Sequence, residues 1–189
     1  SETIKINNEP IENSFCEKTI NDYEKYFKKF DLSAFEIQTF IALKYFQDSE
    51  VDIAIIECGM GGELDATNVF TPILSIITTI SIEHSAFLGE SLSAIAAHKA
   101  GIVKYKVPLL FGKVEGDALD VLINKGKYES APIVQVDAYH HYQTNEKGAS
   151  FDYRPYLGIQ IKNQSQFSAY AASLAIEATN ILSNELPIK

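Results

Sequence analysis

The sequence is poor in sulfur, lacks tryptophan and has no long hydrophobic run. Its 189 residues include two cysteines, Cys16 and Cys58, and one methionine. Two isolated cysteines are too few for a disulfide framework or a zinc site, which favours a reducing cytoplasm. The longest apolar run is well short of the roughly 18–20 residues that span a bilayer, so we expect no membrane segment. The polar start at residues 1–5 is unlike a secretory leader.

Positive charge is also scarce. The chain has 16 Lys and Arg residues against 25 Asp and Glu residues, a net charge of -9. A nucleic-acid surface needs clustered basic residues, so we expect no nucleic-acid partner. The acidity does not exclude anionic small molecules, because a metal ion or a helix N-terminus supplies local positive potential. With 46% hydrophobic residues, the chain is long enough for one domain, with or without a small appendage, that buries its own core.

Two further features are missing: an initial methionine and a phosphate-binding loop. The chain starts at Ser1 and enters a predicted strand at residues 3–6, which suggests a piece cut from a longer protein. The G-x-x-x-x-G-K-[ST] pattern occurs nowhere, and Lys125-Gly126-Lys127 neither follows a strand nor precedes Ser or Thr. If the protein handles ATP, we expect its phosphate cradle outside these residues.

Short β-branched runs alternate with helical patterns along most of the chain. This alternation predicts an α/β fold with a doubly wound, mostly parallel sheet flanked by helices. Near the C-terminus, segments at residues 141–143, 150–153 and 157–162 predict a small antiparallel hairpin region. We expect the other strands at residues 51–57, 73–82, 107–111 and 133–137, and helices at about residues 15–30, 34–47, 91–100, 117–124 and 167–182.

Polar residues and one glycine predict where several helices begin or end. Asn13 or Ser14 is expected to cap the first helix. Ser33, with Glu36 three residues later, makes a capping box for the second. Gly101 is well placed to terminate the helix at residues 91–100.

The most informative segment is ECGMGGELDATN at residues 57–68. It places Glu57 at the end of an apolar strand, followed by a glycine-rich turn and a polar run that ends at Asn68. Ligands of open α/β sheets collect at the carboxyl ends of the strands, where side chains and loop amides converge. This segment is therefore the first candidate for a binding site.

Three candidate ligands follow three consecutive elements: Glu57, His84 and Lys99. A carboxylate and a neutral imidazole at neighbouring strand ends suit one divalent ion, and an oxygen-rich set favours Mg²⁺. Lys99 would join such a set only as a carbamate formed with CO₂. Each residue also has an ordinary interpretation: a solvated carboxylate or helix cap, a loop histidine, and a lysine that interacts with the helix dipole. The glycines of residues 59–62 could simply form a tight turn.

Taken together, these segments resemble the folylpolyglutamate synthase/dihydrofolate synthase family, a branch of the Mur-ligase superfamily. The family pattern is close to EVGLGGRLDATN, then DHxxxLG, then a helix that ends in EKAGI. This chain has ECGMGGELDATN, EHSAFLG and HKAGIVK in the same order and at similar intervals. Residues 32–37 and 6–11 match upstream segments of the family, and the resemblance extends to about Asp137.

The resemblance implies an ATP-dependent amide ligase, with residues 1–189 as its central, ATPase-type domain. It implies that ATP, a substrate, phosphorylates folate or dihydropteroate, and that the amine of L-glutamate then displaces phosphate. The upstream phosphate loop and the C-terminal domain would be missing, so we expect the isolated chain to be inactive. We also expect a cytoplasmic protein, with a monomer favoured. By resemblance, Glu57, His84 and carbamylated Lys99 hold Mg²⁺, and Lys99 and His84 are the catalytic residues. The resemblance also implies which residues contact the pterin side of the substrate: Ser33, Ala34, Phe35, Glu36, Leu64, Asp65 and Ala66.

The chain departs from the family pattern at four places. Glu63 replaces an arginine, Glu83 replaces an aspartate, and His98 replaces a glutamate. A late asparagine that contacts the nucleotide in the family has no counterpart, because Ser168 or Ala169 stands there. Two alternatives therefore stay open: a Mur-type ligase with a non-folate acceptor, and a non-catalytic relic or binding domain.

Overall fold

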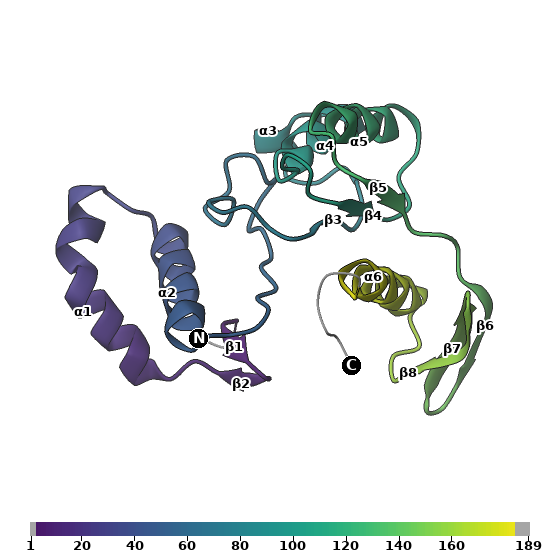
Figure 1. The fold of residues 1–189 in the computed structure, drawn as a ribbon, viewed down its shortest axis with the longest axis horizontal. Coiled ribbons are helices and arrows are strands. Elements are labelled where there is room, and N and C mark those ends of the chain that lie inside the picture. Colours follow the sequence, from purple (N-terminus) through teal and green to yellow (C-terminus); the bar gives the residue numbers. More distant parts are fainter. Residues whose placement is uncertain (1–2, 184–189) are drawn as a thin grey trace. The chain divides into compact units, whose positions relative to one another are not determined.

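The structure is a computed structural model that describes residues 3–183. The described chain divides into two compact units (Figure 1). The first unit comprises the described residues of Ser1–Met60 together with Leu64–Phe70. The second comprises Gly61–Glu63 and the described residues from Thr71 onward. Each unit has its own hydrophobic core and is described separately below.

The first unit is built on two helices and a two-stranded ribbon. Strands β1 (Lys5–Ile6) and β2 (Glu9–Pro10) pair antiparallel, and helices α1 (Asn13–Lys29) and α2 (Ala34–Asp48) follow. Aromatic rings contribute to the contact between the helices: the ring centroids of Tyr23 and Phe40 lie 4.8 Å apart. The buried part of this core consists of Ile4, Ile11 and Ile41.

The start of α1 differs from the prediction. Its N-cap residue is Glu12, and the described structure shows no side-chain cap at this position. Ser14, one of the two predicted caps, donates its hydroxyl to the Glu12 carboxylate at 3.0 Å. The prediction was wrong because Asn13 already belongs to the helix, so neither Asn13 nor Ser14 occupies the extended N-cap position that capping requires.

Residues 51–57 also differ from the prediction, because they form no strand in the structure. Their apolar β-branched run is typical of a buried strand, yet Ile55 is 93% exposed. A strand needs a neighbour to receive its N–H and C=O groups, and within residues 3–183 no strand is paired with this segment. Composition therefore indicated the preference for a strand, whereas a pairing partner decides whether the strand forms.

The second unit contains the predicted parallel sheet. Its strands are β3 (Ser75–Ile77), β4 (Leu109–Phe111) and β5 (Ile133–Gln135), in the order β3-β4-β5. Helices α3 (Ser85–Leu88), α4 (Leu92–Ala100) and α5 (Gly116–Tyr128) lie between them in the chain. The strands are shorter than the sequence indicated, but each falls within a predicted range. The α/β prediction is confirmed.

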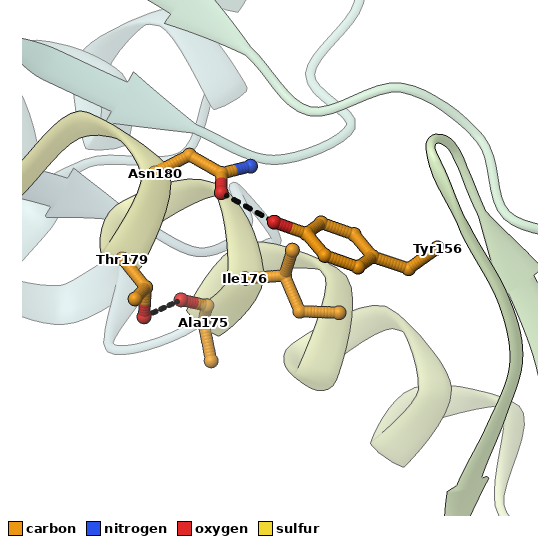
Figure 2. A pocket seen from close by; sticks show the side chains of 5 residues that line it. All are labelled: Tyr156, Ala175, Ile176, Thr179 and Asn180. Atoms are coloured by element: carbon orange, nitrogen blue, oxygen red, sulfur yellow. Dashed lines mark hydrogen bonds between the residues drawn. The ribbon is translucent and has the colours of Figure 1, made fainter. Parts of the chain in front are cut away.

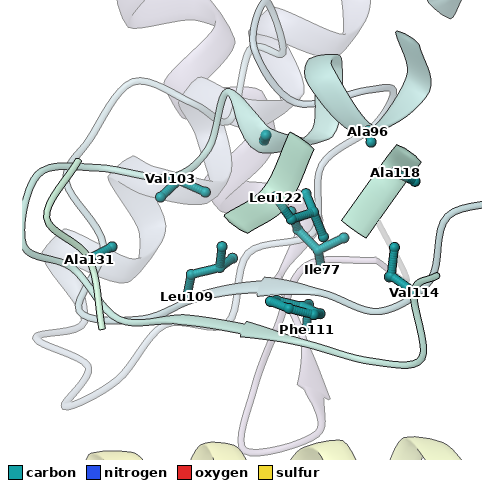
Figure 3. Packing of buried hydrophobic residues seen from close by; sticks show 10 residues of the cluster. Ile77, Ala96, Val103, Leu109, Phe111, Val114, Ala118, Leu122 and Ala131 are labelled. Atoms are coloured by element: carbon teal, nitrogen blue, oxygen red, sulfur yellow. The ribbon is translucent and has the colours of Figure 1, made fainter. Parts of the chain in front are cut away.

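The side chains of β4 alternate in direction, so each face of the sheet presents apolar residues, and helices cover both faces. Leu109 and Phe111 face the core that α4 and α5 close (Figure 3). Leu110, between them, belongs to the opposite core, which helix α6 (Gln166–Leu182) closes with Ala169 and Leu174. All three residues of β4 are buried. This two-sided burial explains why the segment reads as a continuous apolar run.

The predicted hairpin region is a three-stranded antiparallel sheet of β6 (His140–Asn145), β7 (Gly148–Tyr153) and β8 (Tyr156–Ile161). Two tyrosines of this sheet, Tyr153 and Tyr156, donate hydrogen bonds to side chains of α6. The Tyr153 hydroxyl donates to Glu177 at 3.1 Å, and burial, together with the Glu177 carboxylate, raises the pKa of Tyr153 to about 12. Tyr156 donates to Asn180 at 3.0 Å, beside a groove of about 340 Å³ (Figure 2).

Among residues 3–183, no helix is both long and apolar enough to cross a bilayer.

Candidate functional site

In the first unit, the capping box places the predicted substrate-side residues of α2. The Ser33 hydroxyl accepts the Glu36 backbone N–H at 3.3 Å, and the Glu36 carboxylate accepts the Ser33 N–H at 2.7 Å. Hydrogen bonds from the Ser33 hydroxyl and then its N–H lower the pKa of Glu36. The predicted capping box is confirmed. All four residues from Ser33 to Glu36 are exposed at the start of the helix.

The ring of Phe35 lies directly on Gly59, in the glycine-rich segment. A Cβ at Gly59 would lie 2.5 Å from Phe35 Cζ, so an alanine there would have to displace the Phe35 ring. The ring remains 39% exposed. The structure therefore brings the start of α2 and the glycine-rich segment together within the first unit, and leaves an aromatic surface accessible there.

Asp65 organises the polar run that follows the glycines. Its carboxylate accepts the backbone N–H groups of Met60 at 2.8 Å and Thr67 at 2.9 Å, and the Thr67 hydroxyl at 2.6 Å. Burial raises the pKa of Asp65, but these donors outweigh it and the pKa is lowered. Asp65 thus holds its own loop in shape. Thr67, which is buried, is a structural partner that the sequence reasoning missed.

The remaining predicted residues of this segment differ in how far they are exposed. Leu64 is 91% exposed, and Ala66 is half-buried. Cys58 is half-buried, with its Sγ 3.5 Å from the Thr67 hydroxyl. Whether Leu64, Asp65 and Ala66 contact a substrate stays a prediction.

In the second unit, His84 has an unusual backbone. It lies in the left-handed region, with φ 48° and ψ 36°, immediately before α3. Its carbonyl accepts the N–H groups of Phe87 at 2.9 Å and Leu88 at 3.0 Å. A left-handed residue other than glycine costs about 1–2 kcal/mol, and such residues cluster at functional sites. Seven other described non-glycine residues also have positive φ, so the backbone does not by itself distinguish His84 as a candidate.

Lys99, on α4, is joined to the residue next to His84. Its Nζ lies 2.8 Å from Glu83 Oε1, and the side chains of Lys99 and Glu83 are 21% and 43% exposed. The Lys99 ammonium holds the pKa of the Glu83 carboxyl below its usual value. The structure thus brings together Glu83 and Lys99, which the sequence places on separate elements. The Glu83–Lys99 ion pair was not predicted.

The predicted metal set is divided between the units. Glu57 is exposed in the first unit, whereas His84 and Lys99 belong to the second. Within the described part of the chain, no group of three or more His, Cys, Asp or Glu side chains is arranged to hold a metal ion. A set of Glu57, His84 and Lys99 thus needs the carbamate, because an ammonium group paired with Glu83 has no lone pair to donate. The set stays a prediction.

Two other features have ordinary roles. Lys125, in the rejected phosphate-loop motif, pairs with Glu129 at 2.5 Å within and just beyond α5. His140 and His141 are exposed, and His141 Nδ1 lies 2.7 Å from Asp152 Oδ2. We therefore keep the glycine-rich segment and the Glu83–Lys99 region as the candidate functional sites.

Open α/β sheets commonly bind ligands at the carboxyl ends of their strands, and comparison with known proteins identifies the relatives. No family model matches the chain. Folylpolyglutamate synthase of Lacticaseibacillus casei is 36% identical over 132 residues, which are 66% of this chain and 31% of that protein. A probable dihydrofolate synthetase of Schizosaccharomyces pombe is 47% identical over 57% of this chain and 26% of that protein. A putative folylpolyglutamate synthase of Dictyostelium discoideum is 31% identical over 95% of this chain and 29% of its own length.

Solved structures agree with these relatives. The apo form of L. casei folylpolyglutamate synthase (FPGS) has a TM-score of 0.88 at 25% identity, covering 95% of this chain and 47% of that one. An FPGS–AMPPCP complex scores 0.89 at 25% identity, covering 95% of this chain and 48% of that one. An FPGS–AMPPCP–folate complex scores 0.86 at 25% identity, covering 96% of this chain and 49% of that one.

The resemblance drawn from the motifs is confirmed: in sequence and fold, the chain corresponds to a part of the folylpolyglutamate and dihydrofolate synthases. It spans less than a third of the length of the three curated relatives and about half of the solved chains.

Proposed function

We propose that the protein containing this chain is an ATP-dependent ligase that joins L-glutamate to folate or dihydropteroate. The observation that carries the proposal is the fold likeness to nucleotide- and folate-bound synthases, over 95% and 96% of the chain. The ordered motifs at residues 57–68, 83–89 and 98–104 support it independently. ATP would phosphorylate the acceptor carboxylate, and the glutamate amine would displace phosphate from the acyl phosphate.

In this proposal Glu57, His84 and Lys99 hold Mg²⁺, and Lys99 does so as a carbamate. Bound Mg²⁺ would neutralise negative charge on the phosphates. For carbamate formation the Lys99 ammonium has to leave Glu83 and lose one proton; the neutral amine then bonds to the carbon of CO₂ and releases a second proton. The phosphate-binding residues would come from other parts of the whole protein.

The acceptor would bind to the first unit. The Phe35 ring packs against Gly59, and its exposed face offers a flat apolar surface that suits a pterin ring. The Ser33–Glu36 cap and Leu64, Asp65 and Ala66 complete the proposed substrate side. An assay of the full-length protein with folate and with dihydropteroate distinguishes the two acceptors.

The test is ligase activity of the full-length protein with ATP, L-glutamate and Mg²⁺. We expect phosphate release that requires both glutamate and either folate or dihydropteroate. Lys99→Ala should abolish it, whereas Lys127→Ala, on α5, is a matched lysine control that should not. The isolated chain of 189 residues should be inactive under the same conditions. Turnover by that isolated chain would contradict the assignment of a missing phosphate cradle.

Two alternatives are separated by the same assay. Glu63, which reverses the charge of the family residue, motivates a ligase with a non-folate acceptor; activity with another carboxylic acid, and none with pteroate compounds, would favour it. The missing asparagine at Ser168 or Ala169 motivates a non-catalytic binding domain. Folate binding by calorimetry, with no phosphate release under any condition, would favour that reading.

A further inference from the structure

The three residues Gly61–Glu63 lie against the end of α4, the helix that carries Lys99. They group with the second unit, whereas the residues on either side group with the first. The Glu63 N–H donates to the His98 carbonyl at 2.9 Å, and this carbonyl also accepts the N–H of Gly101 at 3.2 Å. The turn therefore supplies a donor from a distant part of the sequence to a carbonyl in the last turn of α4, where intrahelical donors run out.

Glycines on both sides allow this close approach. A Cβ at Gly101 would overlap Cα and Cβ of Glu63 and would lie 2.9 Å from its nitrogen. A Cβ at Gly62 would lie 3.0 Å from the His98 carbonyl oxygen and 3.1 Å from that of Lys99. Gly101 has φ -60° and ψ -17°, which any residue adopts, so its glycine is explained by packing and not by backbone conformation.

The side chains of Glu63 and His98 also approach each other at this contact. Glu63 Oε2 lies 3.9 Å from His98 Nδ1. Residues 63 and 98 are both departures from the family pattern, and the structure makes them neighbours. The reversed charge at Glu63 therefore lies beside His98, whose ring carries a positive charge when protonated.

We propose that the turn Gly61–Glu63 is a backbone clasp that positions Lys99 for the reaction. The turn packs on the carbonyls of residues 98 and 99 and so fixes the backbone of Lys99. The side chain of Lys99 lies 2.8 Å from Glu83 and leaves this ion pair when the carbamate forms. Glu63 and Gly101 are then positioning residues, which act through Lys99. The inference rests on the proposed function for the role of Lys99, but the clasp itself is testable without ligase activity.

The test is Gly101→Ala in the full-length protein. The added methyl group pushes Glu63 away without straining the backbone of residue 101. Because a 1 Å misplacement of a reacting group costs up to about 100-fold in rate, we expect kcat to fall about tenfold or more and KM for ATP to change less than about twofold. The second readout is acetylation of Lys99 by an amine-reactive ester, quantified by mass spectrometry against Lys113. Loosening of the Glu83 pair should raise it at least about threefold, since an unpaired amine is the more accessible nucleophile.

Gly116→Ala is the matched control. Gly116 has φ +61°, where alanine is strained, and a Cβ there would meet nothing within 4 Å. This variant should lose thermal stability while Lys99 acetylation and kcat stay at wild-type values. Equal losses of kcat in both variants at equal loss of Tm, or unchanged Lys99 acetylation in Gly101→Ala, would overturn the clasp.

Two further outcomes keep the clasp and the proposed function separate. If Gly101→Ala does not fold, Gly62→Ala takes its place and is read out in the same way. A Cβ at residue 62 would press on the other side of the contact, 2.9 Å from Ile102 Cγ2 and 3.0 Å and 3.1 Å from the carbonyl oxygens of His98 and Lys99. Unchanged Lys99 acetylation in that folded variant would overturn the clasp. If the wild type has no ligase activity, the proposed function fails, and the acetylation measurement still decides whether the turn positions Lys99.

Discussion

The packing of α5 on the parallel sheet leads to a quantitative prediction for Leu122→Ala. Leu122 is 0% exposed and lies in the core with Ile77 and Phe111 (Figure 3). Removing a fully buried leucine side chain costs about 2–5 kcal/mol, because a cavity remains after the transfer free energy is lost. We take about 3 kcal/mol, since α5 packs in one core with residues of α4 and of the sheet, and its backbone therefore has little freedom to collapse into the gap.

The assay is urea unfolding of the full-length protein, followed by far-UV circular dichroism. With a slope of about 2 kcal/mol per molar urea, a loss of about 3 kcal/mol lowers the midpoint of the corresponding transition by about 1.5 M. Leu157→Ala is the matched control: Leu157 is 74% exposed on β8, so its truncation should change stability by less than about 0.5 kcal/mol. Similar midpoint shifts for the two variants would refute the packing argument.

Three further predictions concern the N-cap of α4, the Glu83–Lys99 ion pair and the Phe35–Gly59 contact. Ser91→Ala removes the side chain that accepts the Ala94 N–H at 3.1 Å and should cost about 1 kcal/mol in thermal unfolding, whereas Ser91→Asn, which also caps, should cost only a few tenths. Equal losses for alanine and asparagine would contradict the capping role. Glu83→Gln removes a carboxyl whose pKa is lowered by Lys99, so the wild type should be more stable than the variant above the ordinary glutamate pKa of 4.5, and the difference should vanish as pH falls through the lowered value. Since Glu83 is 43% exposed, solvent screening limits this difference to at most about 1 kcal/mol, and a difference that grows in acid would show that the sign is wrong. Gly59→Ala should weaken folate binding by the full-length protein, because the methyl group displaces the Phe35 ring that lies 2.5 Å from it; unchanged affinity in titration calorimetry would remove Phe35 from the proposed pocket.

The helices show how far local sequence signals reach. The Ser33–Glu36 capping box was predicted and is present, because both partners lie within four residues of each other and need no other part of the chain. The cap of α1 was wrong by one or two residues, which is the usual uncertainty of helix boundaries. Gly101 was correctly placed at the end of α4, but its reason is the close approach of Glu63, which lies 38 positions earlier in the numbering.

The candidate site shows the same limit. Motif order identified Glu57, His84 and Lys99 as candidates, and the relatives found by comparison are the synthases that the motifs indicated. The left-handed backbone of His84, the ion pair between Glu83 and Lys99, and the role of Asp65 in holding its own loop left no signal in the sequence. These features depend on side-chain directions, which periodicity and spacing do not specify.

The sequence by itself determined the alternation of strands and helices, the antiparallel region near the C-terminus and the relationship to the synthases, because hydrophobic period, turn residues and ordered motifs are local properties. Tertiary structure alone decided which apolar runs became strands. Residues 109–111 pair on both sides with β3 and β5 and are buried, whereas residues 51–57, also rich in apolar side chains, have no strand paired with them in the described structure and stay irregular. The physical reason is that a strand's backbone hydrogen bonds belong to its neighbours, and the identity of those neighbours is not written in the strand's own residues.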